Sequence, residues 1–190
     1  MLLGFFEEAA ARNGARDRRF RIEHAQHLRQ RDIARFGALG VIPSMQPYHV
    51  IDDGRWAGNR LDTARLRGTY AFRTLLDSRA RLAFGSDWTV APLDPVQGIY
   101  AAVTRRTLDD RNPNGWFAEQ DITVEEALRA YTAAVSYAGF AEARTGMIKA
   151  GMLADLALLD RDLLREQPAS LGRARVAGTI VGGRIVYQRR

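Results

Sequence analysis

The sequence predicts an α/β fold in which short parallel strands alternate with helices. Two apolar runs, at residues 20–24 and 82–86, each lead to a polar side chain, His24 and Asp87 respectively. Segments with apolar residues at helical spacing separate these runs, and strands that alternate with helices are typical of a parallel sheet. From residue 146 onward the pattern becomes rich in short apolar runs. That change indicates a second, smaller β region at the end of the chain.

Apolar periodicity defines the elements of the first half. In chain order we expect a helix over 2–12, a strand over 20–24, a helix over 30–39, a strand over 41–45, a helix over 62–78 and a strand over 82–86. Gly14 and Gly40 supply the glycine that commonly ends a helix. Residues 50–61 are rich in Asp and Gly and are expected to form a loop.

Capping residues define the helices of the second half. Asp94 followed by Pro95 is typical of an N-cap and a first-turn proline, which predicts a helix that runs to about residue 106. The turn-rich segment 107–121 is expected to be a long loop. Thr123 and Glu126 have the spacing of a capping box, so a second helix is expected over 123–135.

The last segment carries a hairpin signal. Arg175 to Val181 and Arg184 to Tyr187 read as two strands joined by Gly182-Gly183. A β-like run that contains Leu156, Leu158 and Leu159 precedes them. We therefore expect two regions, residues 1–145 and residues 146–190.

Composition limits the classes of function. The formal net charge is +6, which would suit a nucleic-acid partner, but Lys149 is the only lysine and the arginines are scattered along the chain. No basic cluster is interleaved with aromatic residues, so nucleic-acid binding ranks low. Cysteine is absent, which excludes disulfides and thiolate metal sites. We find no signal peptide and no apolar run long enough to cross a membrane, so a cytoplasmic protein without a membrane partner is expected.

The polar residues at the strand ends are the candidate site. A buried lone carboxylate costs several kcal/mol unless it is paired or binds a metal, so Asp87 is a candidate metal ligand or base, and His24 a candidate metal ligand. Gln46 and His49 follow the strand 41–45, where the catalytic loops of a barrel lie, and His49 is a candidate substrate contact. Structural alternatives stay open for each: Asp87 as the cap of a turn, His24 as a satisfied core residue, and His49 as a loop residue without a role.

Four motifs occur in one order along the chain. They are Arg21-Ile-Glu-His-Ala-Gln26, Ser44-Met-Gln-Pro47, Leu82 to Val90, and Gly146-Met-Ile-Lys-Ala-Gly-Met-Leu-Ala-Asp155. Together they resemble the C-terminal part of a metal-dependent amidohydrolase of the third amidohydrolase family. That branch includes the YtcJ-like hydrolases and N-substituted formamide deformylase. The resemblance implies the last three or so strands and helices of a (β/α)8 TIM barrel, plus part of a small β-sandwich.

The resemblance also implies a chemistry. Family members hydrolyse carbon–nitrogen bonds of small amide-type substrates, using one or two divalent metals, usually zinc. Asp87 matches the catalytic aspartate, which also binds metal, and His24 matches a metal-binding histidine. Gln46, His49 and Trp88 would lie in the substrate pocket, and His27 is expected not to bind metal.

One departure from the family pattern is large. A family site also needs a His-x-His pair, a bridging residue in the middle of the barrel and a further strand-end histidine, and none has a counterpart here. We therefore expect an incomplete metal site, little or no activity of this chain alone, and self-association or association with a missing N-terminal half. The alternative is a non-catalytic α/β fragment that acts only by packing against a partner chain.

Overall fold

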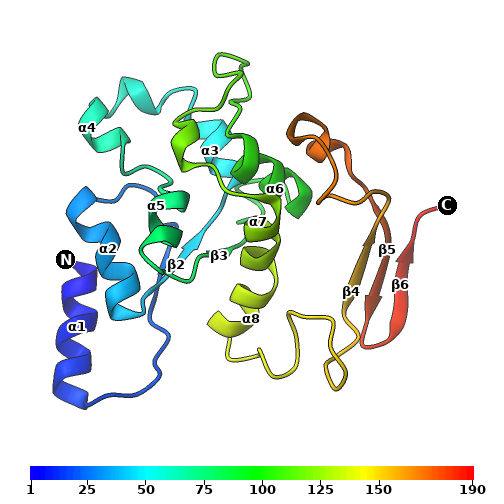
Figure 1. Cartoon of the computed structure of the whole chain (residues 1–190), viewed down its shortest axis with the longest axis horizontal. Helices are drawn as coiled ribbons and strands as arrows, with labels where there is room; N and C mark the ends of the chain where they lie inside the picture. The colour runs from blue at the N-terminus through cyan, green and yellow to red at the C-terminus, as the bar shows by residue number, and fades with distance from the viewer.

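The computed structural model describes all 190 residues and contains two separate three-stranded sheets (Figure 1). The first is parallel, in the order β1-β2-β3, and its strands are β1 (Arg21–Glu23), β2 (Ile42–Met45) and β3 (Ala83–Phe84). The second is antiparallel, and its strands are β4 (Leu156–Leu159), β5 (Val176–Val181) and β6 (Arg184–Gln188). Both the parallel sheet and the C-terminal hairpin predicted from the sequence are confirmed.

Helices gather around the first sheet, with α1 and α2 toward one end of it, α5 near its middle, and α6 to α8 toward the other end (Figure 1). The α-helices are α1 (Leu2–Asn13), α2 (Gln30–Leu39), α3 (Tyr48–Asp53), α4 (Thr63–Leu66), α5 (Phe72–Asp77), α6 (Pro95–Thr104), α7 (Val124–Tyr131) and α8 (Ala133–Ala138). Three 3-10 helices complete the chain: η1 (Ala57–Asn59), η2 (Ala118–Gln120) and η3 (Pro168–Arg173). None of the helices has the length and apolar character needed to cross a membrane.

The helix ends follow the capping signals. Helix α2 has the predicted bounds and ends at Gly40, whose φ of 62° is the left-handed conformation that glycine adopts without steric cost. The Asp94 carboxylate accepts the Val96 N–H at 2.9 Å at the start of α6. Thr123 and Glu126 form the expected capping box, with bonds of 3.2 and 2.8 Å. These helix ends could be predicted from the sequence because each capping side chain and its backbone partner lie within four residues of each other.

Two predictions between residues 48 and 78 are wrong. Residues 50–61 are not simply a loop, because helix α3 continues to Asp53 and η1 follows it. The helix predicted over 62–78 is two helices, α4 and α5, separated by a link that turns at Tyr70, whose φ is 49°. In this link the Tyr70 N–H donates to the Gln26 carbonyl at 2.8 Å, and Thr69 forms an isolated bridge with His27. Pairing with a distant segment therefore overrides the local helical pattern.

The predicted helix over 123–135 and the strand over 82–86 also differ from the structure. Thr132 has φ −122° and ψ −87°, which ends α7 and starts α8 in a new direction. Strand β3 is only Ala83–Phe84, because beyond it the chain turns toward Asp87 instead of continuing along β2.

The core lies between the first sheet and its helices. A chain of edge-to-face aromatic contacts passes through it, from Tyr70 to Phe72, Phe84 and Tyr131, with ring centroids 5.1 to 6.2 Å apart. Such pairs contribute about 0.5–1.5 kcal/mol each beyond their buried area. The chain joins α5, β3 and α7 into one packed unit.

Arg19 connects the start of the first sheet to the end of α8. Its guanidinium carbon lies 3.9 Å from the Tyr137 ring centroid and 4.0 Å from that of Phe140. The same group pairs with the Glu142 carboxylate at 2.6 Å. The contact spans more than a hundred residues of sequence, and it fixes the segment that enters β1.

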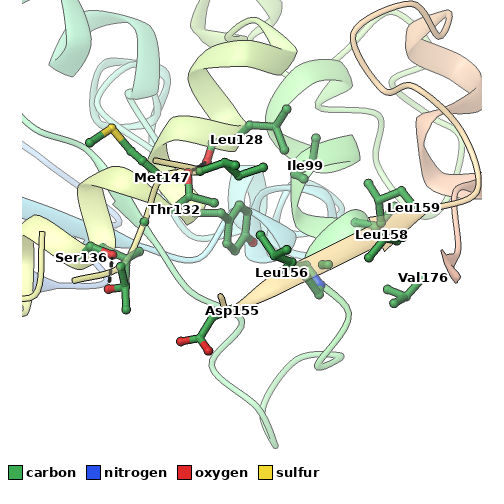
Figure 2. Close-up of a pocket in the computed structure, with 18 of the residues that line it drawn as sticks. Ile99, Leu128, Thr132, Ser136, Met147, Asp155, Leu156, Leu158, Leu159 and Val176 are labelled. Carbon is green, nitrogen blue, oxygen red and sulfur yellow. Dashed lines mark hydrogen bonds between the residues drawn. The ribbon is translucent and has the colours of Figure 1, made fainter. Parts of the chain in front are cut away.

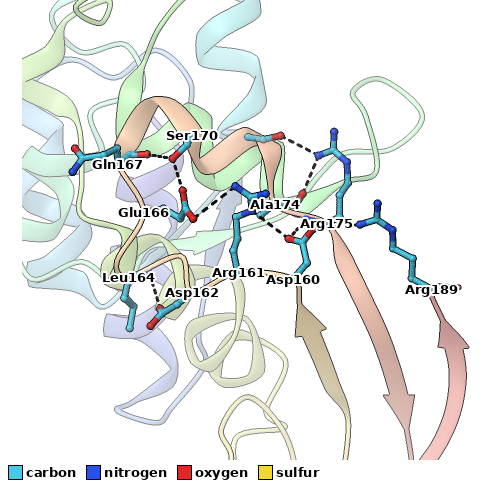
Figure 3. A network of polar contacts seen from close by, with 11 residues as sticks. Asp160, Arg161, Asp162, Leu164, Glu166, Gln167, Ser170, Ala174, Arg175 and Arg189 are labelled. Atoms are coloured by element: carbon cyan, nitrogen blue, oxygen red, sulfur yellow. Dashed lines mark hydrogen bonds and ion pairs between the residues drawn. The ribbon is translucent and has the colours of Figure 1, made fainter.

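The second sheet is attached through η3 and a polar network (Figure 3). The Gln97 amide on α6 donates to the Gly172 carbonyl of η3 at 2.9 Å. At the end of β4 the Asp160 carboxylate accepts the Arg175 N–H at 2.9 Å and pairs with Arg189 at 3.3 Å. Because Arg175 precedes β5 and Arg189 follows β6, this one carboxylate ties together the ends of all three strands.

Candidate metal centre

The candidate site lies at the carboxyl edge of the parallel sheet. His24 directly follows β1, Gln46 directly follows β2, and Asp87 lies three residues beyond the end of β3. The strands are parallel and adjacent, so their carboxyl ends meet at one edge. His49 comes from the first turn of α3, just beyond β2.

The structure brings His24, His49 and Asp87 together. The His24 Nδ1 lies 3.9 Å from the Asp87 Oδ2, and the His49 Nε2 lies 3.7 Å from the same oxygen. One ligand atom from each of the three residues lies within 4.8 Å of the others. Two imidazole nitrogens and a carboxylate oxygen are a donor set that suits zinc, which binds nitrogen and oxygen ligands. These three residues could therefore hold a divalent metal.

Strained backbone accompanies two of the donors. His24 and Asp87 have φ of 65° and 57°, in the left-handed region that residues with a Cβ rarely adopt. Such conformations cost about 1–3 kcal/mol each and cluster at functional sites. In both cases the turn directs the side chain toward the other donors, away from the continuing strand direction.

Gln46 contacts the His24 ring. Its Oε1 lies 2.9 Å from the His24 Nδ1, and Gln46 is itself buried. The His24 side chain is 49% exposed, and the Gln46 contact restrains its ring. Gln46 therefore contacts Nδ1, the same His24 nitrogen that lies 3.9 Å from the Asp87 Oδ2.

His49 is partly buried, and its Nε2 atom is buried without a partner. Its side chain is 13% exposed, and its Nε2 has no hydrogen-bond partner. Burial lowers the pKa of His49, although the charges of Asp87 and Asp53 oppose that shift. A lowered pKa favours the neutral imidazole, which is the form that binds metals. A buried polar atom without a partner is rare in folded proteins and fits a missing ligand.

The remaining predicted residues lie outside the donor set. Trp88 follows Asp87 and is 66% exposed, beside the site but not part of the cluster. The His27 Nδ1 lies 2.9 Å from the Thr69 hydroxyl and does not join the three donors. Sequence reasoning did not place His49 among the metal donors. Asp53 lies four residues after His49 on α3, a spacing that the predicted loop over 50–61 does not contain.

A hollow elsewhere in the molecule lacks these metal donors. A groove of about 790 Å³ separates β4 from α6, α7 and α8 (Figure 2). Most of its lining is apolar, including Ile99, Leu128 and Leu156. Its one carboxylate, Asp155, accepts the Gly182 N–H at 2.7 Å and so caps the β5–β6 turn. No histidine lines the groove. The histidine and carboxylate donors that could hold a metal lie at the sheet edge instead.

Comparison with models of known protein families shows which family the chain belongs to. A family model described as the amidohydrolase family matches residues 1–187. The chain belongs to the amidohydrolase family. The family resemblance carried by the four sequence motifs is thereby confirmed.

This amidohydrolase chain is similar to curated proteins and solved structures. It is 38% identical over 188 residues to LONG AFTER FAR-RED 3 of Arabidopsis thaliana, covering 98% of this chain and 32% of that protein. It is 28% identical over 186 residues to N-substituted formamide deformylase of Arthrobacter pascens, covering 96% of this chain and 33% of that protein. The chain thus spans about a third of the length of the curated relatives it matches.

A solved structure shares the fold. The crystal structure of an uncharacterized metal-dependent hydrolase from Pyrococcus horikoshii matches with a TM-score of 0.73 and 28% identity. The match covers 88% of this chain and 32% of that one. The α/β fold class predicted from the sequence, part of a (β/α)8 barrel with a small second sheet, is confirmed.

Proposed function

We propose that this amidohydrolase chain carries part of the catalytic site of a metal-dependent hydrolase that cleaves carbon–nitrogen bonds in small amide-type substrates. The observation that carries the proposal is the convergence of His24, His49 and Asp87, with a buried, unpartnered nitrogen on His49. The names of the relatives, a formamide deformylase and a metal-dependent hydrolase, support the reaction class.

His24 and Asp87 are the proposed metal ligands, and His49 is the third donor that the geometry offers. Zinc is the proposed metal, since two histidines and a carboxylate with one open position are a common catalytic zinc set. When bound, such a metal lowers the pKa of a coordinated water and polarises the substrate carbonyl. His49 was expected from the sequence to contact substrate, but its burial and its distance of 3.7 Å from Asp87 favour the donor role.

Asp87 is also the proposed general base. Its carboxylate would accept the proton of the attacking water and deliver it to the leaving nitrogen, which must be protonated before the carbon–nitrogen bond breaks. The left-handed turn at Asp87 presents the carboxylate at the sheet edge, and its side chain is 30% exposed and so accessible to water and substrate.

Gln46 and Trp88 are proposed to shape the pocket. Gln46 would orient the His24 ring through the 2.9 Å contact, and it directly follows β2 at the edge where the three donors meet. Trp88 would form an apolar wall, since it directly follows Asp87 and its ring is largely exposed.

We expect weak turnover or none from the isolated chain. Hydrolytic sites work best where water other than the nucleophile is excluded, because electrostatic interactions strengthen in a dry site. Here the His24 side chain is half exposed, so the donor set opens to solvent on one side. Metal binding is therefore a more direct test than turnover.

Cobalt titration tests the proposal. Co²⁺ bound to nitrogen and oxygen donors gives visible absorption bands, and the intensity reports occupancy. We expect Asp87→Asn to abolish binding, while Asp94→Asn retains it, because Asp94 caps helix α6 and lies outside the donor set. Wild-type chain that binds no Co²⁺, or Asp87→Asn that binds as wild type does, would contradict the proposed metal centre. Hydrolysis of N-formyl and N-acyl amines, lost in Asp87→Asn, would extend the test to the reaction.

A further inference from the structure

A closed polar triangle lies beside the donor set. The Asp53 Oδ2 accepts the Gln26 side-chain amide at 2.6 Å and the Tyr70 hydroxyl at 2.5 Å. The Gln26 amide also donates to the Tyr70 hydroxyl oxygen. One carboxylate oxygen thus takes two donors that are themselves bonded to each other. Such networks fix their members more tightly than isolated pairs do.

The triangle joins three segments that are distant in sequence. Gln26 stands two residues after His24, Asp53 is the last residue of α3, and Tyr70 lies in the link between α4 and α5. Main-chain bonds hold Tyr70 on both sides: its N–H donates to the Gln26 carbonyl at 2.8 Å, and its carbonyl accepts the Arg105 guanidinium at 3.0 Å. Tyr70 and Arg105 are fully buried. The triangle is therefore anchored in the core, not on the surface.

The triangle includes a residue of α3, the helix that also carries His49. Asp53 follows His49 by four residues, so the two side chains lie on one side of the helix, one turn apart. The six-residue α3 has no side-chain N-cap, so its own capping does little to fix it. Main-chain bonds also hold its end, since the Leu108 N–H donates to the Ile51 carbonyl at 3.0 Å. The side chain of Asp53 is the polar anchor that ties this helix to the segment after His24.

We infer that Asp53 is a positioning residue for the candidate metal centre, and that Gln26 and Tyr70 hold it in place. The inference rests on the proposed metal-binding function. Asp53 is not among the three donors, so it acts through His49 by fixing the rotation and position of α3. Because Gln26 and His24 share one short segment, the same anchor sets the spacing between the two histidine rings, whose centroids are 6.2 Å apart.

Two substitutions weaken the triangle without removing bulk. Tyr70→Phe deletes only the hydroxyl and keeps the ring packed against Phe72. Asp53→Asn keeps the size of the side chain but removes its charge. If the new NH₂ group takes the place of Oδ2, it faces the Gln26 amide and the Tyr70 hydroxyl, which are both donors, and neither bond can form as before. Matched controls exist elsewhere in the chain. Asp62→Asn alters an exposed helix N-cap at α4, and Tyr131→Phe alters an interior tyrosine that contacts none of the donors.

The experiment has one readout with metal and one without. Co²⁺ affinity of the full chain is measured by visible absorption for wild type and the four variants. Loss of an outer contact to a metal site typically weakens affinity by about 10- to 100-fold, and we expect that range for Asp53→Asn and Tyr70→Phe. The two controls should stay within about twofold of wild type, because neither residue belongs to the donor set or to the triangle. In the metal-free protein, NMR of the histidine rings should show the His49 signals shifted or broadened in Asp53→Asn but unchanged in Asp62→Asn.

The outcomes separate this inference from the proposed function. Wild-type Co²⁺ affinity in both Asp53→Asn and Tyr70→Phe overturns the positioning role and leaves the metal centre intact. If wild type binds no Co²⁺ yet the His49 signals respond to Asp53→Asn alone, the proposed function fails and the positioning of His49 stands. Unchanged His49 signals in Asp53→Asn, with folded protein in both cases, overturn the inference directly.

Discussion

The contact between Gly98 and Tyr131 offers a quantitative test of the packing between α6 and α7. A Cβ placed on Gly98 would lie 1.9 Å from the Tyr131 hydroxyl oxygen and 2.9 Å from the ring carbon that bears it. In an unobstructed helix Gly→Ala gains about 1 kcal/mol, whereas overpacking a core costs about 1–3 kcal/mol. Because 1.9 Å is far inside any tolerable separation, we expect the upper end of that cost. Gly98→Ala should therefore destabilise the protein by about 2 kcal/mol net.

Removing the hydroxyl should recover much of that loss. In the Tyr131→Phe background the nearest atom to the new methyl group is the ring carbon, and a small ring movement relieves the remaining contact. We expect the cost of Gly98→Ala to fall by about 1 kcal/mol or more, measured as the coupling energy of a double-mutant cycle in urea. Additivity of the two substitutions within about 0.5 kcal/mol would refute the reasoning, since it would mean that the hydroxyl is not the obstacle.

Two further predictions concern acid stability and assembly. The Arg19 guanidinium holds the pKa of Glu142 at about 2, below its ordinary value, so the pair stabilises the fold at neutral pH and that contribution is lost as the pH falls from about 4.5 toward 2. Glu142→Gln should therefore lower the Tm at pH 7 while leaving it nearly equal to wild type near pH 2, and an equal difference at both pH values would contradict the assignment. Strands β1 and β3 each pair on one side only, and Ile185 and Val186 on β6 are 68% and 61% exposed, so we expect concentration-dependent self-association by sedimentation velocity. A single 21.2 kDa species at all concentrations would show that these edges and side chains do not promote pairing.

Local signals in the sequence predicted those parts of the fold whose partners are close in the chain. The bounds of α2, the Asp94 cap and the Thr123 capping box all depend on bonds within one helical turn. The parallel sheet could also be predicted, since its strands are short apolar runs separated by helices. The split of the predicted helix over 62–78 could not, because it depends on the pairing of Thr69 and Tyr70 with residues 26 and 27.

In the candidate site too, the residues marked by a local sequence pattern could be predicted, and those placed by distant contacts could not. His24 and Asp87 could be singled out because each directly follows an apolar run. The inclusion of His49 depended on the direction in which α3 leaves β2, which no local pattern encodes. The Asp53 triangle could not be predicted for the same reason, since its three members are brought together only by the packing of three separate segments.

The Arg19 clamp has a consequence for local unfolding and hydrogen exchange. Its partners Tyr137, Phe140 and Glu142 belong to the end of α8 and the turn after it, whereas Arg19 itself leads into β1 and on to His24. If α8 opens, the segment before β1 loses its anchor at the same moment. The amides of these two regions should then exchange as one cooperative unit with a shared opening free energy. The order of the edge that holds the candidate site therefore depends on a helix more than a hundred residues further along the chain.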